Sequence, residues 1–319
     1  MSERLVLADT ATIPVPTIFH EPWWLKVASG SLYQEAIVLS GSTVVGRLPY
    51  LQLSKLGGQR ALVMPPMTHV LGPALAPEVA AHDLTQSLRR FTIASKLIAQ
   101  LPPSSHVWFR LHYGATNTLA FEAAGYTSGI DFTVEIHPED PAVIWQKMRD
   151  KTRNVIRRAQ EKVEVTDTLD FVAFMDFYDQ NLRSRSLTNN FDRFICQAVM
   201  EACSERRVGK CLVAKGEKGL WKAAIFTVWD DRAEYYLMST RSTDSGNGEI
   251  SLLIWTAIQS AMAGGRIFDL DGINRRNMML LTGFGGQIKS RYIVSKSSTP
   301  YRIAHFAKAL IGRRSNPLK

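Results

Sequence analysis

Two runs near the start of the chain, residues 34–40 and 43–50, are rich in apolar side chains and are joined through Gly41-Ser42. Apolar runs of this length around a glycine-containing turn predict a β-hairpin. Residues 77–101 instead have helical spacing, with one apolar stripe made of Val79, Leu84, Leu88, Phe91 and Ala94. The other elements expected in this half are strands at 61–64, 106–111 and 131–136, a Pro/Gly loop from Met64 to Pro73, and a short helix at 116–124.

The second half repeats this order of elements. Apolar runs at 210–215, 221–229 and 233–239 predict a meander, and the loop Ser245-Gly246-Asn247-Gly248 precedes a buried helix at 249–263. A strand at 266–271, a short helix at 275–282, the turn Gly283-Phe284 and a strand at 287–295 follow. The residues of the two halves do not match, but the order of their elements does. This order predicts one α+β module folded twice.

Between the two modules, the sequence predicts a strongly basic helix at 141–162 and two further helices around 169–182 and 191–206. We therefore expect an N-terminal domain at 1–140 and a C-terminal domain at 141–319 that opens with the basic helix. A chain of 319 residues is long enough for two domains of ordinary size.

Composition narrows the class of protein. With 45% hydrophobic and 21% charged residues the chain is typical of soluble globular proteins, and no run approaches the roughly 18 apolar residues of a membrane span. The N-terminus has no signal-peptide pattern, and the three cysteines form no CxxC pair, so we expect a cytoplasmic protein without a disulfide framework or metal site. A net charge of +9 favours polyanionic ligands such as phosphates, coenzymes, RNA or an anionic membrane.

Several motifs, taken in order, resemble the FemAB-like proteins of the GNAT superfamily. They are Phe19-His20-Glu21-Pro22-Trp23-Trp24 near the start, Lys151-Thr152-Arg153-Asn154-Val155-Ile156-Arg157-Arg158-Ala159 in the basic helix, and Phe268-Asp269-Leu270-Asp271-Gly272 followed by Phe284-Gly285-Gly286 near the end. The resemblance runs along nearly the whole chain. It implies two tandem GNAT-like domains with mixed central sheets flanked by helices, and an acyltransferase that forms an amide on an amine acceptor.

The resemblance implies no permanently bound cofactor and two kinds of co-substrate, acyl-CoA or aminoacyl-tRNA. The Fem aminoacyltransferases usually carry an aspartate soon after a Gly-Pro pair, whereas Gly72-Pro73-Ala74-Leu75 is followed here by Ala76. The chain also lacks room for their tRNA-associated coiled coil. Acyl-CoA is therefore the expected donor, aminoacyl-tRNA is the alternative, and a non-catalytic protein that binds RNA or anionic lipid is a third reading.

The glycine loop is the candidate donor site. Arg241, Gly246, Asn247 and Gly248 lie directly ahead of the Glu249 helix, where backbone N–H groups and the helix dipole favour an anion. The coenzyme-A loop of single-domain acetyltransferases has the pattern R-x-x-G-x-G, and this loop is two residues longer. A plain turn between strand and helix is the competing interpretation.

The basic helix is the candidate substrate-binding element. Residues 147–162 carry seven Lys or Arg and two acids, and Lys151, Arg153 and Arg157 are expected to contact phosphate groups of the donor or acceptor. Arg153 and Arg157 lie one turn apart and form a candidate clamp. A solvated basic face is the alternative.

Three residues are catalytic candidates. Asp269 and Asp271 alternate on a strand, so we expect their side chains on opposite faces, with one of them accepting the proton of the attacking amine. Capping of the helix near Asn274 is their other possible role. Tyr236 is a candidate proton donor to the leaving group, although core packing also explains a tyrosine on this strand. The segment 301–314 combines apolar and basic residues and is expected either to dock on the protein or to lie on an anionic membrane.

Overall fold

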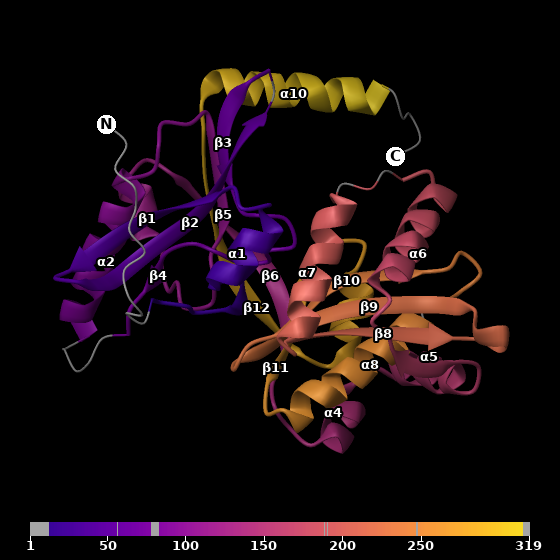
Figure 1. Ribbon diagram of the computed structural model, residues 1–319. Helices are drawn as coiled ribbons and strands as arrows, with labels where there is room; N and C mark the ends of the chain where they lie inside the picture. The colour runs from indigo at the N-terminus through magenta and orange to yellow at the C-terminus, as the bar shows by residue number, and fades with distance from the viewer. Residues whose placement is uncertain are drawn as a thin grey trace. The chain divides into compact units, whose positions relative to one another are not determined.

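The computed structural model describes residues 13–55, 57–77, 83–187, 189, 191–246 and 248–314. These residues belong to two compact units (Figure 1). Unit 1 contains Met1–Leu25, Ser31–Gly129 and Tyr292–Lys319, and unit 2 contains Lys26–Gly30 and Ile130–Arg291. The expected boundary after residue 140 differs from this division. The chain passes from one unit to the other inside two strands, β6 (Thr127–Ile136) and β12 (Gln287–Ser297).

Unit 1 has a mixed sheet in the order β1-β2-β3-β5-β12. Its only parallel pair among the described strands is β3 with β5; the other neighbours are antiparallel. Its elements are η1 (Ile18–His20), the start of α1 (Pro22–Ala28), β1 (Tyr33–Ser40), β2 (Thr43–Lys55), β3 (Gln59–Val63), β4 (Ala74–Leu75), α2 (Asp83–Ala99), β5 (His106–Arg110), α3 (Leu119–Ala123), the start of β6 (Thr127–Ile136), the end of β12 (Gln287–Ser297) and α10 (Thr299–Arg314).

Unit 2 has a mixed sheet in the order β6-β11-β10-β9-β8-β7, and its parallel pair is β10 with β11. Helices α4, α5 and α8 cover one face, and α6 and α7 cover the other (Figure 1). Its further elements are α4 (Pro141–Lys147), α5 (Asp150–Gln160), β7 (Glu164–Asp167), α6 (Phe171–Ser184), α7 (Arg193–Glu205), β8 (Gly209–Lys215), η2 (Glu217–Gly219), β9 (Trp221–Trp229), β10 (Ala233–Arg241), α8 (Gly248–Ala263), β11 (Ile267–Gly272), α9 (Met278–Leu281) and η3 (Thr282–Phe284).

The two sheets share one pattern of pairing, so the repeat predicted from the sequence is present in the structure. Two antiparallel pairs in unit 1 and three in unit 2 lead to a parallel pair, which in each unit is followed by one antiparallel strand. The last strand, however, comes from the other half of the chain. Residues 293–297 of β12 pair with β5, and Thr133 and Ile136 of β6 pair with β11. Each half therefore completes the sheet of the other.

The core of unit 1 differs from the expected one at α2. Leu84, Leu88 and Phe91 are 71%, 59% and 39% exposed, while Ile93, Leu97 and Ile98 are buried against the sheet. Val79, the first residue of the expected stripe, lies outside the described residues. The predicted stripe was wrong because residues at both phases of this helix are apolar, and the sequence alone does not select the phase that meets the sheet.

The basic segment forms two helices rather than the single helix expected at 141–162. The backbone turns to extended geometry at Met148 and Arg149, and the Arg149 N–H donates to the Gly283 carbonyl at 3.0 Å. The contact with Gly283, which is distant in sequence, thus interrupts the helix at Met148 and Arg149, where the sequence has no glycine or proline. Among the described helices none is long and apolar enough to cross a bilayer.

Candidate active site

The candidate site lies where strands β10 and β11 of unit 2 separate. The two strands pair in parallel over three residues, from Ala233↔Ile267 to Tyr235↔Asp269. Both strands then lose regular pairing: β10 shifts register against β9 between Tyr236 and Met238, and β11 shifts against β6 between Asp269 and Gly272. Within the described chain, β9 and β11 are the only strands beside β10, so its edge facing β11 beyond Tyr235 carries backbone groups without a strand partner. Carboxyl ends of parallel strands are a usual place for ligands in open sheets.

The matching position in unit 1 is filled by the protein itself. Beyond the parallel pair of β3 and β5, the Leu71 N–H donates to the Arg110 carbonyl at 2.8 Å, and the His112 N–H donates to the Leu71 carbonyl at 2.9 Å. The early motif braces this segment, since the His20 imidazole contacts the Gly72 carbonyl at 3.4 Å and the indole of Trp24 donates to Thr68. No described segment pairs in this way with β10 beyond Tyr235, which makes unit 2 the candidate catalytic unit.

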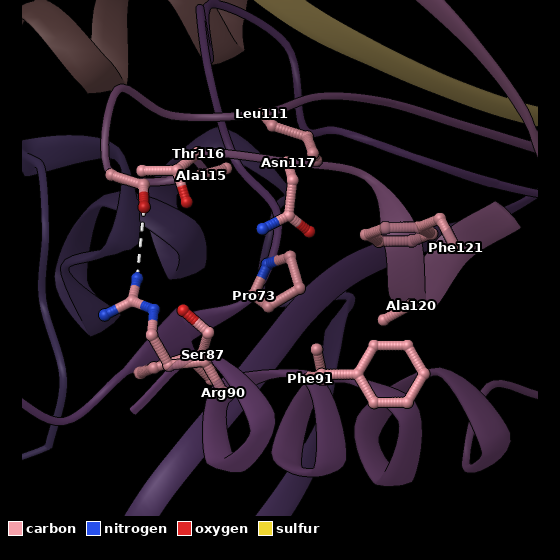
Figure 2. A pocket seen from close by; sticks show the side chains of 13 residues that line it. Pro73, Ser87, Arg90, Phe91, Leu111, Ala115, Thr116, Asn117, Ala120 and Phe121 are labelled. Atoms are coloured by element: carbon pink, nitrogen blue, oxygen red, sulfur yellow. Dashed lines mark hydrogen bonds between the residues drawn. The ribbon is translucent and has the colours of Figure 1, made fainter. Parts of the chain in front are cut away.

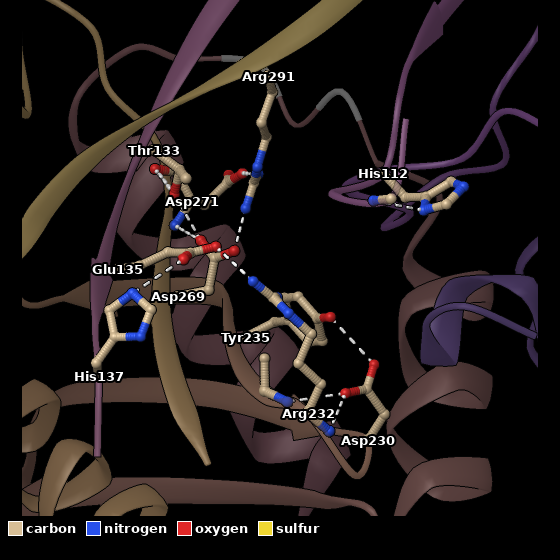
Figure 3. Close-up of polar contacts among 12 residues, drawn as sticks. His112, Thr133, Glu135, His137, Asp230, Arg232, Tyr235, Asp269, Asp271 and Arg291 are labelled. Carbon is tan, nitrogen blue, oxygen red and sulfur yellow. Dashed lines mark hydrogen bonds and ion pairs between the residues drawn. The ribbon is translucent and has the colours of Figure 1, made fainter. Parts of the chain in front are cut away.

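Asp269 and Asp271 lie beside this gap and share one cation (Figure 3). Asp269 is 1% exposed, accepts from the Thr133 hydroxyl at 2.5 Å and from the Asp271 N–H at 3.0 Å, and forms an ion pair with Arg291. Asp271 Oδ1 is 3.8 Å from Nη1 of the same arginine. The expectation that the two side chains face opposite sides was therefore wrong.

The backbone explains this arrangement. Asp271 has φ = 63°, in the left-handed region that non-glycine residues rarely adopt, so the alternation of the strand stops there. The Asp271 side chain is 32% exposed, whereas that of Asp269 is enclosed. The helix-capping role was also wrong for both, because Asn277 is the N-terminal cap residue of α9 and Asp269 binds the Asp271 N–H instead. Of the two, Asp271 is the carboxylate that a substrate can reach.

Tyr236 lies on β10 at the point where the strands separate. Burial, opposed by a hydrogen bond with Ser239 and assisted by the negative charge of Asp271, raises the pKa of its hydroxyl to about 12. The two predicted residues are therefore close enough for their charges to interact. Tyr236 remains protonated at neutral pH and can act as a hydrogen-bond or proton donor.

The glycine loop precedes α8 as predicted, but Arg241 braces it internally. The guanidinium donates to the Gly246 carbonyl at 3.0 Å and to the Ser245 carbonyl. Burial lowers the pKa of Arg241, and the nearby cation Arg185 lowers it further, while Glu249 opposes the shift. Two neighbouring arginines at a helix N-terminus attract an anion, and the Glu249 carboxylate in the first helical turn weakens that attraction. Asn247 lies outside the described residues.

Gly248 has a packing role that the sequence did not reveal. A Cβ atom added at this residue would lie 2.8 Å from the Val155 carbonyl oxygen and 3.4 Å from the Ala159 side chain. The glycine therefore allows α5 and the start of α8 to approach closely. At Gly246 a Cβ atom would meet nothing nearer than 3.9 Å.

The arginines of α5 divide into structural and exposed residues. Arg153 donates to the carbonyls of Trp145 and Gln146 at 3.2 and 2.8 Å and pairs with Asp150, so it holds the end of α4. Arg157 lies over the Trp145 ring, 5.5 Å from its centroid, and is exposed. Lys151 is exposed as well. The structure thus leaves Arg157 and Lys151, rather than an Arg153–Arg157 pair, in position to meet a ligand.

Unit 1 contains a separate pocket between α2 and α3 (Figure 2). Arg90, Ser87 and Asn117 line it together with apolar side chains that include Phe91 and Phe121, and Arg90 donates to the Gly114 carbonyl at 3.1 Å. None of its lining residues is acidic. The pocket therefore supplies no carboxylate to accept a proton from an amine. Elsewhere in the described chain no group of three His, Cys, Asp or Glu side chains is placed to hold a metal ion.

Comparisons with known proteins agree with this placement. Residues 146–275, all within unit 2, match the family model described as an acetyltransferase (GNAT) domain. Among solved structures, FemX has a TM-score of 0.64 at 10% identity, covering 88% of this chain and 93% of that one. L-PGS from Bacillus licheniformis has a TM-score of 0.54 at 11% identity, covering 91% of each chain. A tandem GNAT protein from the clavulanic acid biosynthesis pathway has a TM-score of 0.51 at 9% identity over 83% of each. No curated protein matches the sequence.

The match of residues 146–275 to the acetyltransferase (GNAT) domain indicates that the protein is a transferase enzyme. Its α+β architecture of mixed sheets flanked by helices is the one expected from the sequence. Residues 146–275 thus match a GNAT domain and the chain has the fold of FemX, which agrees with the resemblance of its motifs.

Proposed function

We propose that the protein is an N-acyltransferase that takes an acyl group from acyl-CoA and transfers it directly to an amine in the gap between β10 and β11. The separation of these two strands beside Tyr236 and Asp271 carries the proposal. The matching gap in unit 1 is closed by the segment around Leu71, so unit 2 is proposed to hold the single reaction centre.

The chemistry of the donor agrees with the gap. The pantetheine arm of coenzyme A is an extended chain with two amides, and the edge of β10 beyond Tyr235 offers backbone groups that can pair with them as an added strand does. The coenzyme's phosphates are expected near the first turn of α8, between its N–H groups and Arg185. Arg241 contributes indirectly. It binds the carbonyls of Ser245 and Gly246, so that these oxygens do not face the bound phosphate.

The reaction is then a single displacement at the acyl carbon. The acceptor nitrogen attacks the thioester carbonyl, so a C–N bond forms and the C–S bond breaks. Asp271 takes the proton of the attacking amine, and the Tyr236 hydroxyl donates a proton to the departing thiolate. Solvent exchange returns one proton to Tyr236 and removes one from Asp271. Asp269 positions Asp271 by accepting its backbone N–H and by fixing Arg291.

An aminoacyl-tRNA donor is the second candidate, and the surface of α5 favours it. Arg157 lies over Trp145, and Lys151 and Arg158 are exposed on the same helix. Cations next to an aromatic ring are typical of surfaces that bind a single-stranded nucleic acid. In this alternative the same carboxylate and tyrosine act, and an ester C–O bond breaks instead of the thioester C–S bond.

Thermal denaturation with each donor distinguishes the two candidates. Coenzyme A at 100 times its dissociation constant is expected to stabilise the fold by about 2.7 kcal/mol, and uncharged tRNA is expected to have no such effect. Tyr236→Phe is expected to keep this stabilisation and to lower the rate of acyl transfer. No shift with millimolar coenzyme A, together with a shift in the presence of tRNA, would transfer the assignment to aminoacyl-tRNA. Three buried free thiols support a proposed cytoplasmic location, because disulfides are rare there.

A further inference from the structure

The last helix of the chain, α10 (Thr299–Arg314), is attached to unit 1 mainly through its first turn (Figure 1, yellow). Tyr301 is 6% exposed and stacks on His106 of β5, with ring centroids 4.5 Å apart and planes 3° from parallel. The Tyr301 N–H donates to the Ser298 hydroxyl at 3.3 Å. This contact fixes where the helix begins and the direction in which it leaves the sheet.

The next turn presents apolar side chains to solvent. Ile303 and Phe306 are 65% and 66% exposed, and their spacing of three places them on the same face of the helix. This observation overturns the expectation that the segment docks through these side chains on the body of the protein. A neighbouring isoleucine and phenylalanine left in water on one helix face indicate a surface that binds something else.

The charges around this face select the partner. Arg302 is exposed one turn before Phe306, and Lys308 is exposed on the opposite side of the helix. Residues 299–319 contain five Lys or Arg and no Asp or Glu. The partner must therefore be anionic and must also accept an isoleucine and a phenylalanine into an apolar layer. A second copy of this helix has the same positive charge, which opposes self-association, and RNA offers no apolar layer for Ile303.

We propose that α10 is a peripheral membrane-binding helix that lies on an anionic lipid surface. Ile303 and Phe306 enter the boundary between headgroups and acyl chains, while Arg302 meets the lipid phosphates. The helix has 16 residues and lies along the surface rather than across the bilayer. The contact between Tyr301 and His106 links the membrane-bound helix to the sheet of unit 1. This proposal does not depend on the identity of the donor.

Vesicle flotation of the full chain tests the proposal. Vesicles of phosphatidylcholine with phosphatidylglycerol are expected to carry the protein, and vesicles of phosphatidylcholine alone are expected to carry far less. The double variant Ile303→Glu, Phe306→Glu should lose about tenfold or more in binding, and Arg302→Glu about fivefold or more, because each cation near an anionic surface accounts for about a fivefold change. Raising the salt concentration should weaken binding of the native chain.

The matched control places the same charges on apolar side chains of unit 2 that are equally exposed. Phe194 and Leu220 are 78% and 62% exposed, and Phe194→Glu with Leu220→Glu should bind vesicles as the native chain does. Circular dichroism and the melting temperature verify that each variant is folded. Absence of binding to the anionic vesicles would overturn the proposal, as would an equal loss in the control. A native dimer in light scattering that becomes monomeric in the Ile303→Glu, Phe306→Glu variant would identify a second copy as the partner instead.

Discussion

Asp269 and Asp271 are two residues apart on β11, yet both carboxylates turn toward the guanidinium of Arg291, at 3.8 Å in the case of Asp271. The left-handed backbone at Asp271 brings this about, and the Asp269 carboxylate holds it by accepting the Asp271 N–H. One carboxylate is buried and fully bonded, while the other is partly open. Their roles should therefore separate cleanly in mutants.

Asp271→Asn should lower kcat by about a hundredfold while changing the free energy of unfolding little, because it removes a proton acceptor from a partly exposed position. Asp269→Asn should instead destabilise the fold by about 3 kcal/mol, because it leaves the buried Arg291 charge without its partner. Single-turnover rates and urea unfolding of both variants measure these effects. Equal, small losses of rate in two well-folded variants would remove both residues from the mechanism.

A buried carboxyl in unit 2 makes stability depend on pH. Glu234 is 0% exposed, and burial raises its pKa to about 7 from an ordinary value of 4.5, against smaller opposing effects of Thr227 and Arg266. Between these two pH values the native state binds more protons than the unfolded state, so its stability falls as pH rises. Glu234→Gln imitates the protonated form. It should match the native chain at pH 4.5 and exceed it in stability by about 3 kcal/mol at pH 8.

Urea unfolding across this pH range measures the difference between the two proteins. Glu217→Gln is the control, because Glu217 is exposed and this variant should keep the pH dependence of stability of the native chain. If the difference in the free energy of unfolding between the native chain and Glu234→Gln stayed constant from pH 4.5 to 8, Glu234 would be ionised in the folded state throughout this range.

The regular elements could be predicted because their signals are local. The apolar runs of β9 and α8 give their limits to within one residue, and the order of elements reveals the repeat. The pairing of β6 with β11 and of β12 with β5, by which each half of the chain completes the sheet of the other, could not be predicted. Strand pairing joins residues far apart in the chain. The break after α4 has the same cause, since Gly283 supplies its acceptor.

The geometry around the candidate site residues could be predicted only in part. Asp271 lies close to both Tyr236 and Arg291. Alternation along a strand failed at Asp271, because a positive φ at a non-glycine residue leaves no mark in the sequence. Arg291, which joins the two carboxylates, was missed since it lies on β12 and no local motif surrounds it.

The two glycines before α8 should respond differently to alanine. Gly248→Ala should destabilise the fold by about 1 to 3 kcal/mol, despite the better helix propensity of alanine, because its Cβ would lie 2.8 Å from the Val155 carbonyl oxygen. Gly246→Ala is the control and should leave stability nearly unchanged, because its Cβ meets nothing within 3.9 Å. Thermal unfolding of both variants checks this, and equal melting temperatures would contradict the packing role of Gly248.

The arginines of α5 should separate stability from binding. Arg153→Ala should cost about 1 to 3 kcal/mol of stability through the lost bonds to the Trp145 and Gln146 carbonyls, and leave the Michaelis constants unchanged. Arg157→Ala should affect stability by less than about 1 kcal/mol and raise a Michaelis constant about tenfold. Lys162→Ala, near the end of α5, is the control for diffuse charge. An equal rise in the Michaelis constant for Lys162→Ala would show that Arg157 makes no specific contact.

Amide hydrogen exchange with and without coenzyme A tests the central claim, that the open gap of unit 2 is the donor site. Binding should slow the exchange of amides at residues 236–241 of β10 and in the first turn of α8, where the backbone meets the pantetheine and the phosphates. The amides of Leu71 and His112, which already close the matching gap of unit 1, should not change. Protection confined to unit 1, or no protection of β10 at saturating coenzyme A, would contradict the account.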